Sequence, residues 1–324
     1  MSTSELARED GDLVPLVVVG GPTAAGKSQL ALELARRHGG TIISADSRQV
    51  YRGFDIGTAK PTRAEPAEVP HEMIDIAEPT ETYTVARYRS DARAAIARAH
   101  RAGRVPLVVG GTGFYIRAVL GYTPVPPVPP DPERRKRLEA LPDLHERVRA
   151  VDPEAASRLH PHDRFRLARA LEVFEASGRR LSDFKAEPAP YRTAYLVIAL
   201  SRDLLKQRID RRVDEMLDLG WMGEIERIVT EFGPDLGLLQ TLGYAELMAV
   251  RSGNLTLDQA RGLIAQNTWR YARRQLAWFR HEPSARWLEM DGDGTLEAWI
   301  ELAERELSDW IATRGATRSS TPSP

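Results

Sequence analysis

One stretch near the amino terminus of this 324-residue chain restricts its fold more than any other. The apolar run at residues 16–19 stops at two glycines, and residues 21–28 then fit the pattern G-x-x-x-x-G-K-[ST]. Glycines let such a loop turn its backbone N–H groups inward, and the helix that follows adds its positive N-terminal end. Residues 28–38 have a helical pattern that is closed by Gly39-Gly40. The stretch therefore predicts a buried strand, a phosphate-binding loop and a helix, in that order.

The composition is that of an ordinary globular protein, with 42% hydrophobic and 28% charged residues. The length allows a large core and two structural units. The chain has no cysteine, which excludes disulfides and thiolate zinc sites. A formal net charge of −1 neither suggests nor excludes a nucleic-acid partner, because the distribution of charge matters more than its sum.

The sequence has no feature that points to a membrane. No apolar run approaches the roughly 20 residues that are needed to span a bilayer. The acidic segment 1–12 lacks the basic-then-apolar order of a signal peptide. We therefore expect a cytoplasmic protein without membrane association, and we expect it to act as a monomer.

The segments beyond the first helix alternate between strand and helix patterns. This alternation predicts an α/β core with a parallel sheet, of the P-loop nucleoside-triphosphatase type, in residues 13–122 and 191–314. Residues 1–12 and 315–324 are expected to be disordered. The expected strands are at residues 16–19, 41–45, 70–76, 105–109, 194–200 and 286–290, and the expected helices are at 28–38, 83–101, 203–219, 221–232, 256–280 and 295–312.

The composition changes where residues 123–132 carry six prolines, which is typical of an extended linker. From there to residue 190 the pattern is helical only. Asp131, Asp152 and Asp163 each have the form of a helix N-cap, the first two with Pro at the next position, and Gly178 ends the last helix. We therefore expect a helical insertion domain at residues 123–190.

An acid follows the second predicted strand. Ligands of parallel α/β sheets lie outside the carboxyl ends of the strands, so Asp46 is expected beside the phosphate-binding loop. An ordinary NTPase holds Mg²⁺ with an acid at the end of an apolar strand, but the strand at 105–109 ends in Gly110-Gly111-Thr112 instead. Asp46 is well placed to take a proton from an acceptor, although it also fits an N-cap for a turn at Ser47. The pattern favours a group-transfer enzyme over a motor.

Basic residues with aromatic neighbours form three clusters outside the predicted sheet. Such clusters suit RNA, because splayed bases stack on aromatic rings while phosphates accept from arginines; solvated helix faces are the alternative for any single cluster. Apart from these clusters, Arg208 and Arg212 lie one helical turn apart. They suit a clamp on a charged leaving group; the alternative is that they form ion pairs with Asp210, Asp214 and Glu215. The three clusters are Arg134, Arg135 and Arg137; Arg164, Arg166 and Arg169; and Arg270, Arg273 and Arg274 with Trp269, Tyr271, Trp278 and Phe279.

Several motifs occur together and in a characteristic order. They are Gly21-Pro22-Thr23-Ala24-Ala25-Gly26-Lys27-Ser28, Ser44-Ala45-Asp46-Ser47-Arg48-Gln49-Val50-Tyr51, Gly57-Thr58-Ala59-Lys60-Pro61, Pro70-His71, Val109-Gly110-Gly111-Thr112-Gly113-Phe114-Tyr115, Arg169-Ala170-Leu171-Glu172-Val173 and Gly243-Tyr244. This set closely resembles the bacterial tRNA dimethylallyltransferase family over about residues 15–290.

The resemblance implies transfer of a dimethylallyl group from dimethylallyl diphosphate to N6 of the adenosine just 3′ of a tRNA anticodon. It implies that the loop holds the diphosphate with Mg²⁺ as cofactor, which Ser28 would help to bind. It also implies catalytic roles for Thr23, Lys27, Asp46 as the general base and Arg212 at the departing diphosphate. The implied contacts to the tRNA anticodon arm are Asp46, Ser47, Arg48, Gln49, Thr112, Arg135, Phe165, Arg166, Leu167, Ala168 and Arg169.

This sequence departs from the family at Phe165, where Gln is more frequent, so we expect stacking in place of a polar contact. Two other functions use the same loop. One is a small-molecule kinase that binds ATP, and the other is an RNA-binding NTPase switch without transfer chemistry. Binding or hydrolysis of ATP would favour either of them.

Overall fold

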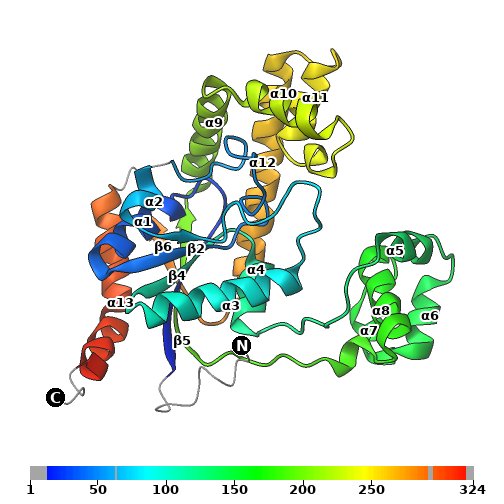
Figure 1. Cartoon of the computed structure of the whole chain (residues 1–324), viewed down its shortest axis with the longest axis horizontal. Coiled ribbons are helices and arrows are strands. Elements are labelled where there is room, and N and C mark those ends of the chain that lie inside the picture. Colours follow the sequence, from blue (N-terminus) through cyan, green and yellow to red (C-terminus); the bar gives the residue numbers. More distant parts are fainter. Residues whose placement is uncertain (1–12, 63, 291–294, 319–324) are drawn as a thin grey trace. The chain divides into compact units, whose positions relative to one another are not determined.

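The computed structural model describes residues 13–62, 64–290 and 295–318 of the chain. These residues form two compact units (Figure 1). The first, called the sheet unit here, comprises residues 13–83, 91–116 and 190–318, and the second, the helical unit, comprises Thr84–Ser90 and Arg117–Ala189. The helical insertion was predicted at residues 123–190. The predicted disorder of residues 1–12 and 319–324 lies outside the described residues.

The strands of the described residues form one sheet in the order β3-β2-β4-β1-β5-β6, and every neighbouring pair is parallel. All of β2 and β4 is buried, as expected for strands covered on both faces. The predicted α/β core with a parallel sheet is confirmed. The strands are β1 (Val14–Gly20), β2 (Gly40–Ser44), β3 (His71–Glu72), β4 (Val105–Gly110), β5 (Tyr191–Leu200) and β6 (Ala285–Met290).

Several predicted boundaries were wrong, and for two of them the backbone conformation gives the reason. The strand expected at residues 70–76 is only two residues long, because Met73 and Asp75 adopt left-handed backbone conformations with φ of 69° and 55° that an extended strand does not allow. Gly39, with φ of 62°, ends the first helix by itself, and Gly40 is already the first residue of β2.

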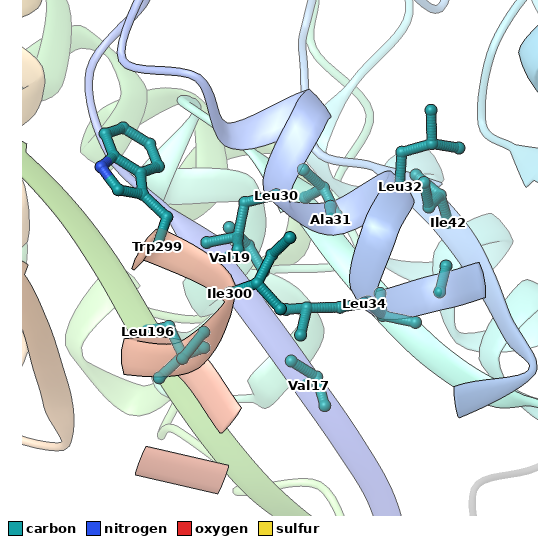
Figure 2. Close-up of a cluster of buried hydrophobic side chains, with 14 of the residues drawn as sticks. Val17, Val19, Leu30, Ala31, Leu32, Leu34, Ile42, Leu196, Trp299 and Ile300 are labelled. Atoms are coloured by element: carbon teal, nitrogen blue, oxygen red, sulfur yellow. The ribbon is translucent and has the colours of Figure 1, made fainter. Parts of the chain in front are cut away.

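Two helices cover one face of the sheet with an apolar core (Figure 2). Leu30 and Leu34 of α1 (Lys27–His38) and Ile300 of α13 (Leu296–Arg318) pack on strand residues such as Val17 and Val19. Burying an aliphatic side chain of this kind stabilises the fold by about 1.5–3 kcal/mol. Helix α13 extends six residues beyond its predicted end at residue 312, so residues 315–318 of the predicted disordered tail are helical.

The last part of the sheet unit consists mainly of helices. Helix α12 packs against both α9 and α11. Leu205 and Ile209 of α9 and Ala272 of α12 form a small core with Ala24 of the phosphate-binding loop, which brings both helices to that loop. These helices are α9 (Arg202–Asp218), α10 (Trp221–Phe232), α11 (Tyr244–Arg251) and α12 (Leu257–Phe279), with the short η2 (Gly237–Gln240); the unit also contains α2 (Ala64–Glu68) and parts of α3 (Val85–Arg101) and α4 (Gly113–Leu120).

The helical unit has its own core, in which Leu138, Leu144 and Leu167 are buried. The three predicted N-caps are confirmed, since Asp131, Asp152 and Asp163 accept hydrogen bonds from backbone amides three residues further on. None of the described helices is long and apolar enough to cross a membrane. The helices of this unit are α5 (Pro132–Glu139), α6 (Leu144–Val151), α7 (Pro153–Arg158), α8 (Arg164–Ser177) and the short η1 (Leu181–Asp183).

Candidate active site

A cavity of about 470 Å³ opens where three adjacent strands of the sheet unit end. Its walls include residues that follow the carboxyl ends of β1, β4 and β2, which is where ligands of parallel sheets bind. Helices α9 and α12 form another part of the wall. Among the residues of this wall are the predicted Thr23, Lys27, Ser28, Asp46, Ser47, Arg48, Gln49 and Arg212.

The phosphate-binding loop is tightly wound. Gly21 and Gly26 have φ of 138° and 94°, and Ala24 has φ of 61°, which is uncommon for a residue with a side chain. The Lys27 Nζ donates a hydrogen bond of 2.6 Å to the carbonyl of Pro22 across the loop. Lys27 and Ser28 are the first two residues of α1, so their side chains lie at its positive end, as the sequence pattern predicted.

Asp46 lies in a turn directly after β2. Its Oδ1 accepts hydrogen bonds from the backbone amides of Arg48 and Gln49 at 2.8 and 3.4 Å. The amide of Ser47 donates to Oγ1 of Thr112 at 3.3 Å, which joins this turn to the one that follows β4. The alternative function of Asp46 in a turn is therefore observed, and the same carboxylate also lines the cavity.

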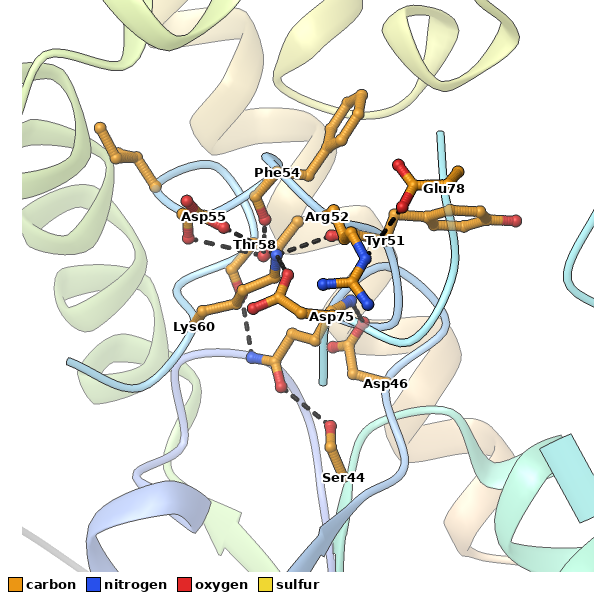
Figure 3. A network of polar contacts seen from close by, with 12 residues as sticks. Ser44, Asp46, Tyr51, Arg52, Phe54, Asp55, Thr58, Lys60, Asp75 and Glu78 are labelled. Atoms are coloured by element: carbon orange, nitrogen blue, oxygen red, sulfur yellow. Dashed lines mark hydrogen bonds and ion pairs between the residues drawn. The ribbon is translucent and has the colours of Figure 1, made fainter. Parts of the chain in front are cut away.

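The loop after this turn is held by an almost buried lysine (Figure 3). The Lys60 Nζ donates to the Tyr51 carbonyl at 2.6 Å and pairs with Asp55 at 2.7 Å and with Asp75 at 2.5 Å. At the other edge of this network, Gln49 donates to the carbonyls of Thr58 and Ala59 and accepts from the hydroxyl of Ser44. The motif containing Lys60 thus has a structural role that supports the Asp46 turn.

Three charged groups of the cavity interact electrostatically. Burial, and then the positive charge of Arg212, lower the pKa of Lys27 to about 7, although Asp46 partly opposes the shift. Burial also lowers the pKa of Arg212, again with Asp46 in opposition. Asp214, one of the ion-pair partners considered for Arg212, pairs instead with Arg261. The cavity wall carries four basic side chains, Lys27, Arg48, Arg212 and Arg274, against the carboxylate of Asp46, so it favours an anionic ligand.

Part of the cavity wall is apolar. Ile209, Val213 and Met216 of α9, Trp221 of α10 and Ile264 of α12 all contribute to it. Residues 240–242, at the end of η2 and before α11, also line the cavity. A site with a phosphate-binding loop at one part of its wall and aliphatic and aromatic side chains at another suits a ligand that joins a phosphate to a short hydrocarbon.

Two residues that hold the site together, Gln275 and Glu224, were missed from the sequence. Gln275 of α12, 7% exposed, accepts a 2.8 Å hydrogen bond from the Thr23 amide and donates one of 2.9 Å to the Gly111 carbonyl. Tyr271, one turn earlier on the same helix, was named in the third basic cluster; it lines the cavity, and burial together with the charge of Asp46 raises its pKa to about 12. In the sequence, Gln275 lies at helical spacing from Ala272 and Phe279, which are apolar and buried. A polar residue on this buried helix face was the signal that could have indicated its role.

The second missed residue is Glu224 of α10, which is 1% exposed. Its carboxylate accepts from the successive amides of Asp55, Ile56 and Gly57 at 2.9, 2.7 and 3.2 Å, and from the Tyr244 hydroxyl at 2.6 Å. Four donors compensate for the loss of hydration of a buried carboxylate. Since Gly57 and Tyr244 line the cavity, Glu224 holds that part of the wall together.

The predicted tRNA-binding residues of the helical unit fall into an exposed and a buried set. Phe165 and the side chain of Arg166 are 61% and 66% exposed, and the Arg135 guanidinium lies 5.1 Å from the centre of the Phe165 ring. Leu167 and Ala168 are 0% exposed, because their positions on α8 face the core of the unit. Their side chains therefore belong to the core of the unit, and a contact of these two positions with tRNA stays a prediction.

Arg135 and Arg169 share one buried partner. Each donates a 2.6 Å hydrogen bond to Oε2 of Glu172, which is 1% exposed, and Oε1 of Glu172 accepts from the Asp131 amide. Arg169 also donates to the Val128 carbonyl. Burial opposes ionisation of Glu172, but these donors outweigh it and lower the pKa of the carboxyl group. Arg135 and Arg169 therefore organise the helical unit, whatever else they bind.

Comparisons with known proteins agree with this geometry. The family described as IPP transferase matches residues 49–282, and the one described as isopentenyl transferase matches residues 14–76. The chain belongs to the IPP transferase family. A tRNA dimethylallyltransferase of Gloeobacter violaceus is 48% identical over 298 residues, which cover 90% of this chain and 99% of the relative.

Solved structures of relatives have the same fold. The full-length tRNA isopentenylpyrophosphate transferase of Bacillus halodurans has a TM-score of 0.71 at 35% identity and covers 94% of this chain and 99% of that one. A eukaryotic dimethylallyltransferase that acts on tRNA has a TM-score of 0.79 at 25% identity, covering 92% and 80%. Family membership confirms the predicted resemblance and the P-loop NTPase-like fold, and it supports a prenyltransferase over an ATP-dependent kinase.

Proposed function

We propose that this IPP transferase family member transfers a dimethylallyl group from dimethylallyl diphosphate to N6 of the adenosine on the 3′ side of a tRNA anticodon. The observation that carries the proposal is the single cavity in which the phosphate-binding loop, the carboxylate of Asp46, the guanidinium of Arg212 and an apolar wall meet. The names of the relatives, which are tRNA dimethylallyltransferases, support the same reaction.

The donor binds with its diphosphate at the residues Gly21, Pro22, Thr23, Ala24, Ala25, Gly26, Lys27 and Ser28. Loop amides and Lys27 hold the anion, and the five-carbon chain lies against the apolar residues of α9 and α10. In the reaction the adenine N6 forms a bond to the allylic carbon while the bond from that carbon to the diphosphate oxygen breaks. Asp46 takes the proton from N6, and Arg212 with Lys27 stabilises the charge of the leaving diphosphate.

Mg²⁺ is part of this proposal. The hydroxyl of Ser28 is a hard oxygen ligand on the cavity wall, while no cluster of three or more acidic or histidine side chains that could form a protein cage is found in the part of the chain that the structure describes. Ser28 therefore suits an ion that is shared with the diphosphate. When bound, Mg²⁺ would supply additional neutralisation of the leaving group.

The acceptor is proposed to be the anticodon arm of tRNA. The target adenine leaves the base stack to reach Asp46, and Ser47, Arg48, Gln49 and Thr112 are the proposed contacts near it. Phe165 and Arg166 offer an exposed ring and an exposed cation to the RNA, which suits stacking and phosphate binding. Arg135 supports the Phe165 ring. A cytoplasmic monomer that meets its tRNA in solution completes the proposal.

The test is a transfer assay with unmodified tRNA, Mg²⁺ and dimethylallyl diphosphate labelled in its hydrocarbon part. Label is expected in the tRNA, and nuclease mapping is expected to place it on the adenosine after the anticodon. A parallel reaction with labelled ATP tests the kinase alternative. Transfer of a phosphoryl group from ATP, with no prenyl label in any tRNA that has an adenosine at that position, would overturn the proposal.

A further inference from the structure

We infer that Gln275 is a positioning residue for prenyl transfer, whose side-chain amide fixes the phosphate-binding loop to the turn that carries Thr112 and adjoins Asp46. This inference rests on the proposed function and adds a residue to it. Gln275 comes from α12, far along the sequence from both segments that it joins. It lies on the cavity wall and would act on the reaction through those two segments.

The bridge requires an amide. The Thr23 N–H needs an acceptor, which the Gln275 Oε1 supplies at 2.8 Å, and the Gly111 carbonyl needs a donor, which Nε2 supplies at 2.9 Å. These two partners also determine the orientation of the amide. A carboxylate has acceptors only, and an aliphatic chain has neither group. Because the side chain is nearly buried, a partner left without its hydrogen bond would not be compensated by water.

The space around the bridge is closed to larger side chains. A Cβ on Gly111 would lie 2.1 Å from the Gln275 Nε2, so the side chain of Gln275 occupies the room that a residue other than glycine would need. At Gly20, at the end of β1, a Cβ would lie 2.7 Å from the Phe279 ring. Phe279 follows Gln275 by one turn of α12 and is 0% exposed, so α12 is a rigid base for the amide.

The bridge connects the two halves of the proposed chemistry. Thr23 belongs to the loop that binds the donor diphosphate, while Gly111 is followed by Thr112, whose hydroxyl accepts from the Ser47 amide next to Asp46. Gln275 therefore adds a side-chain link between the loop and the Asp46 turn, beyond the backbone pairing of β1 and β2 with β4. Transfer needs the attacking nitrogen and the allylic carbon about 3–3.5 Å apart, and a misplacement of about 1 Å costs on the order of 100-fold in rate.

Two variants test the bridge in the full-length protein. Gln275→Met has a similar shape but no amide, and it is expected to lower kcat about 100-fold while it changes the KM for tRNA much less. Gln275→Glu keeps an acceptor for Thr23 but faces the Gly111 carbonyl with an oxygen, until the carboxyl group is protonated and becomes a donor. The matched control is Gln266→Ala, an exposed glutamine on the same helix, which is expected to retain the wild-type rate.

The pH dependence separates positioning from stability. Relative to wild type at each pH, the Gln275→Glu variant is expected to recover at least about tenfold in kcat between about pH 8 and pH 6, because burial raises the pKa of a carboxyl group at this position. The Gln275→Met variant has nothing to titrate and is expected to stay low over the same range. Thermal unfolding of each variant shows whether it is folded.

The possible results are distinct. If wild type transfers no prenyl group, the proposed function fails, and the bridge is then judged by binding of inorganic diphosphate with Mg²⁺, which the Met variant is expected to weaken about tenfold. If wild type is active and a folded Gln275→Met variant keeps kcat within threefold of it, the inference is overturned. A Gln275→Glu variant that shows the same low relative kcat at every pH also overturns it, even if the Met variant does not fold.

Discussion

Two pairs of basic residues, one in each unit, show that the same charge serves two purposes. Lys27 and Arg212 line the cavity of the sheet unit, with Asp46 as the carboxylate that partly balances them. Arg135 and Arg169 of the helical unit both donate to the buried Glu172. The first pair has positive charge left for a ligand, whereas the second pair is used within the unit.

The pKa shifts report this difference. Burial and Arg212 lower the pKa of Lys27 to about 7, so the cavity disfavours a further positive charge until an anion enters. In the helical unit the arginines and the Asp131 amide lower the pKa of Glu172 despite its burial, so the ionised form is favoured there. All four basic residues were predicted to contact a ligand, and only the surrounding groups distinguish those that can hold a substrate from those that are used within the fold.

The largest expected effect is at the carboxylate of the cavity. Asp46→Asn keeps the Oδ1 that accepts from the amides of Arg48 and Gln49, but it removes the general base. The rate of transfer is expected to fall about 1000-fold, within the range for general bases. Quench-flow measurement of labelled tRNA gives the rate, and filter binding is expected to show tRNA affinity within twofold of wild type. A rate within tenfold of wild type would remove Asp46 as the base.

Next in size is the effect at Lys27. Lys27→Met is expected to weaken binding of inorganic diphosphate about 10- to 100-fold, the value of a charge-assisted hydrogen bond. In wild type, diphosphate binding raises the lowered pKa of Lys27, so the protein takes up a proton and affinity falls as the pH rises above about 7.

Calorimetry in two buffers with different heats of ionisation measures this proton. Lys27→Arg is the matched control, because a guanidinium stays charged throughout. At about pH 8 wild type is expected to take up nearly one proton more than this variant, since titration of diphosphate itself is common to both. Equal proton uptake by the two proteins would contradict the electrostatic account of the cavity.

Because Arg135 and Arg169 both donate to Glu172, we expect removal of this carboxylate to lower the stability of the helical unit. Glu172→Gln leaves two guanidiniums without their carboxylate and is expected to cost the unit about 3 kcal/mol, measured by hydrogen exchange. The matched control, Glu154→Gln, removes an exposed surface partner and is expected to cost less than about 0.5 kcal/mol.

The contribution of Glu172 to stability also depends on pH. Because the pKa of Glu172 is lowered in the folded state, this contribution is complete above the ordinary pKa of 4.5 and is lost as the pH falls through the lowered pKa. Equal losses in the two variants would remove the distinction.

The smallest expected effect is at the exposed cation of α8. Arg166→Ala is expected to weaken tRNA binding about fivefold and to reduce the slope of log affinity against log salt by about one. The control is Arg158→Ala, because the Arg158 side chain on α7 is about as exposed as that of Arg166. This variant is expected to leave the tRNA affinity and the salt slope unchanged. Titrations at several salt concentrations provide the comparison. An unchanged salt slope in the Arg166 variant would place that residue outside the RNA contact.

The local parts of this molecule could be predicted from the sequence, because their physical causes are local. The phosphate-binding loop follows from its glycines, and the caps of the helical unit from Asp131, Asp152 and Asp163. The order of strands and helices follows from periodicity, which also brings Asp46 to the loop. One local prediction, the strand at residues 70–76, was wrong. Met73 and Asp75 adopt left-handed backbone conformations there, which their residue types do not predict.

The long-range contacts could not be predicted in the same way. Gln275 is hydrogen-bonded to Thr23 at a sequence separation of 252 residues, and Glu224 to Gly57 at a separation of 167. A local sequence pattern therefore predicts neither pair. What the sequence does contain is a polar residue on an otherwise apolar helix face in each case. Likewise, the basic motif around Arg169 did not reveal that Glu172, in the same motif, neutralises it.

We propose that the cavity of the sheet unit carries out the reaction and that the helical unit provides part of the affinity for tRNA. Single-turnover transfer, measured over a series of tRNA concentrations for wild type, Asp46→Asn and Arg166→Ala, tests it most directly. Asp46→Asn is expected to lower the plateau rate and leave the half-saturating tRNA concentration unchanged, whereas Arg166→Ala is expected to raise that concentration and leave the plateau unchanged. The same parameter changing in both variants would contradict the account.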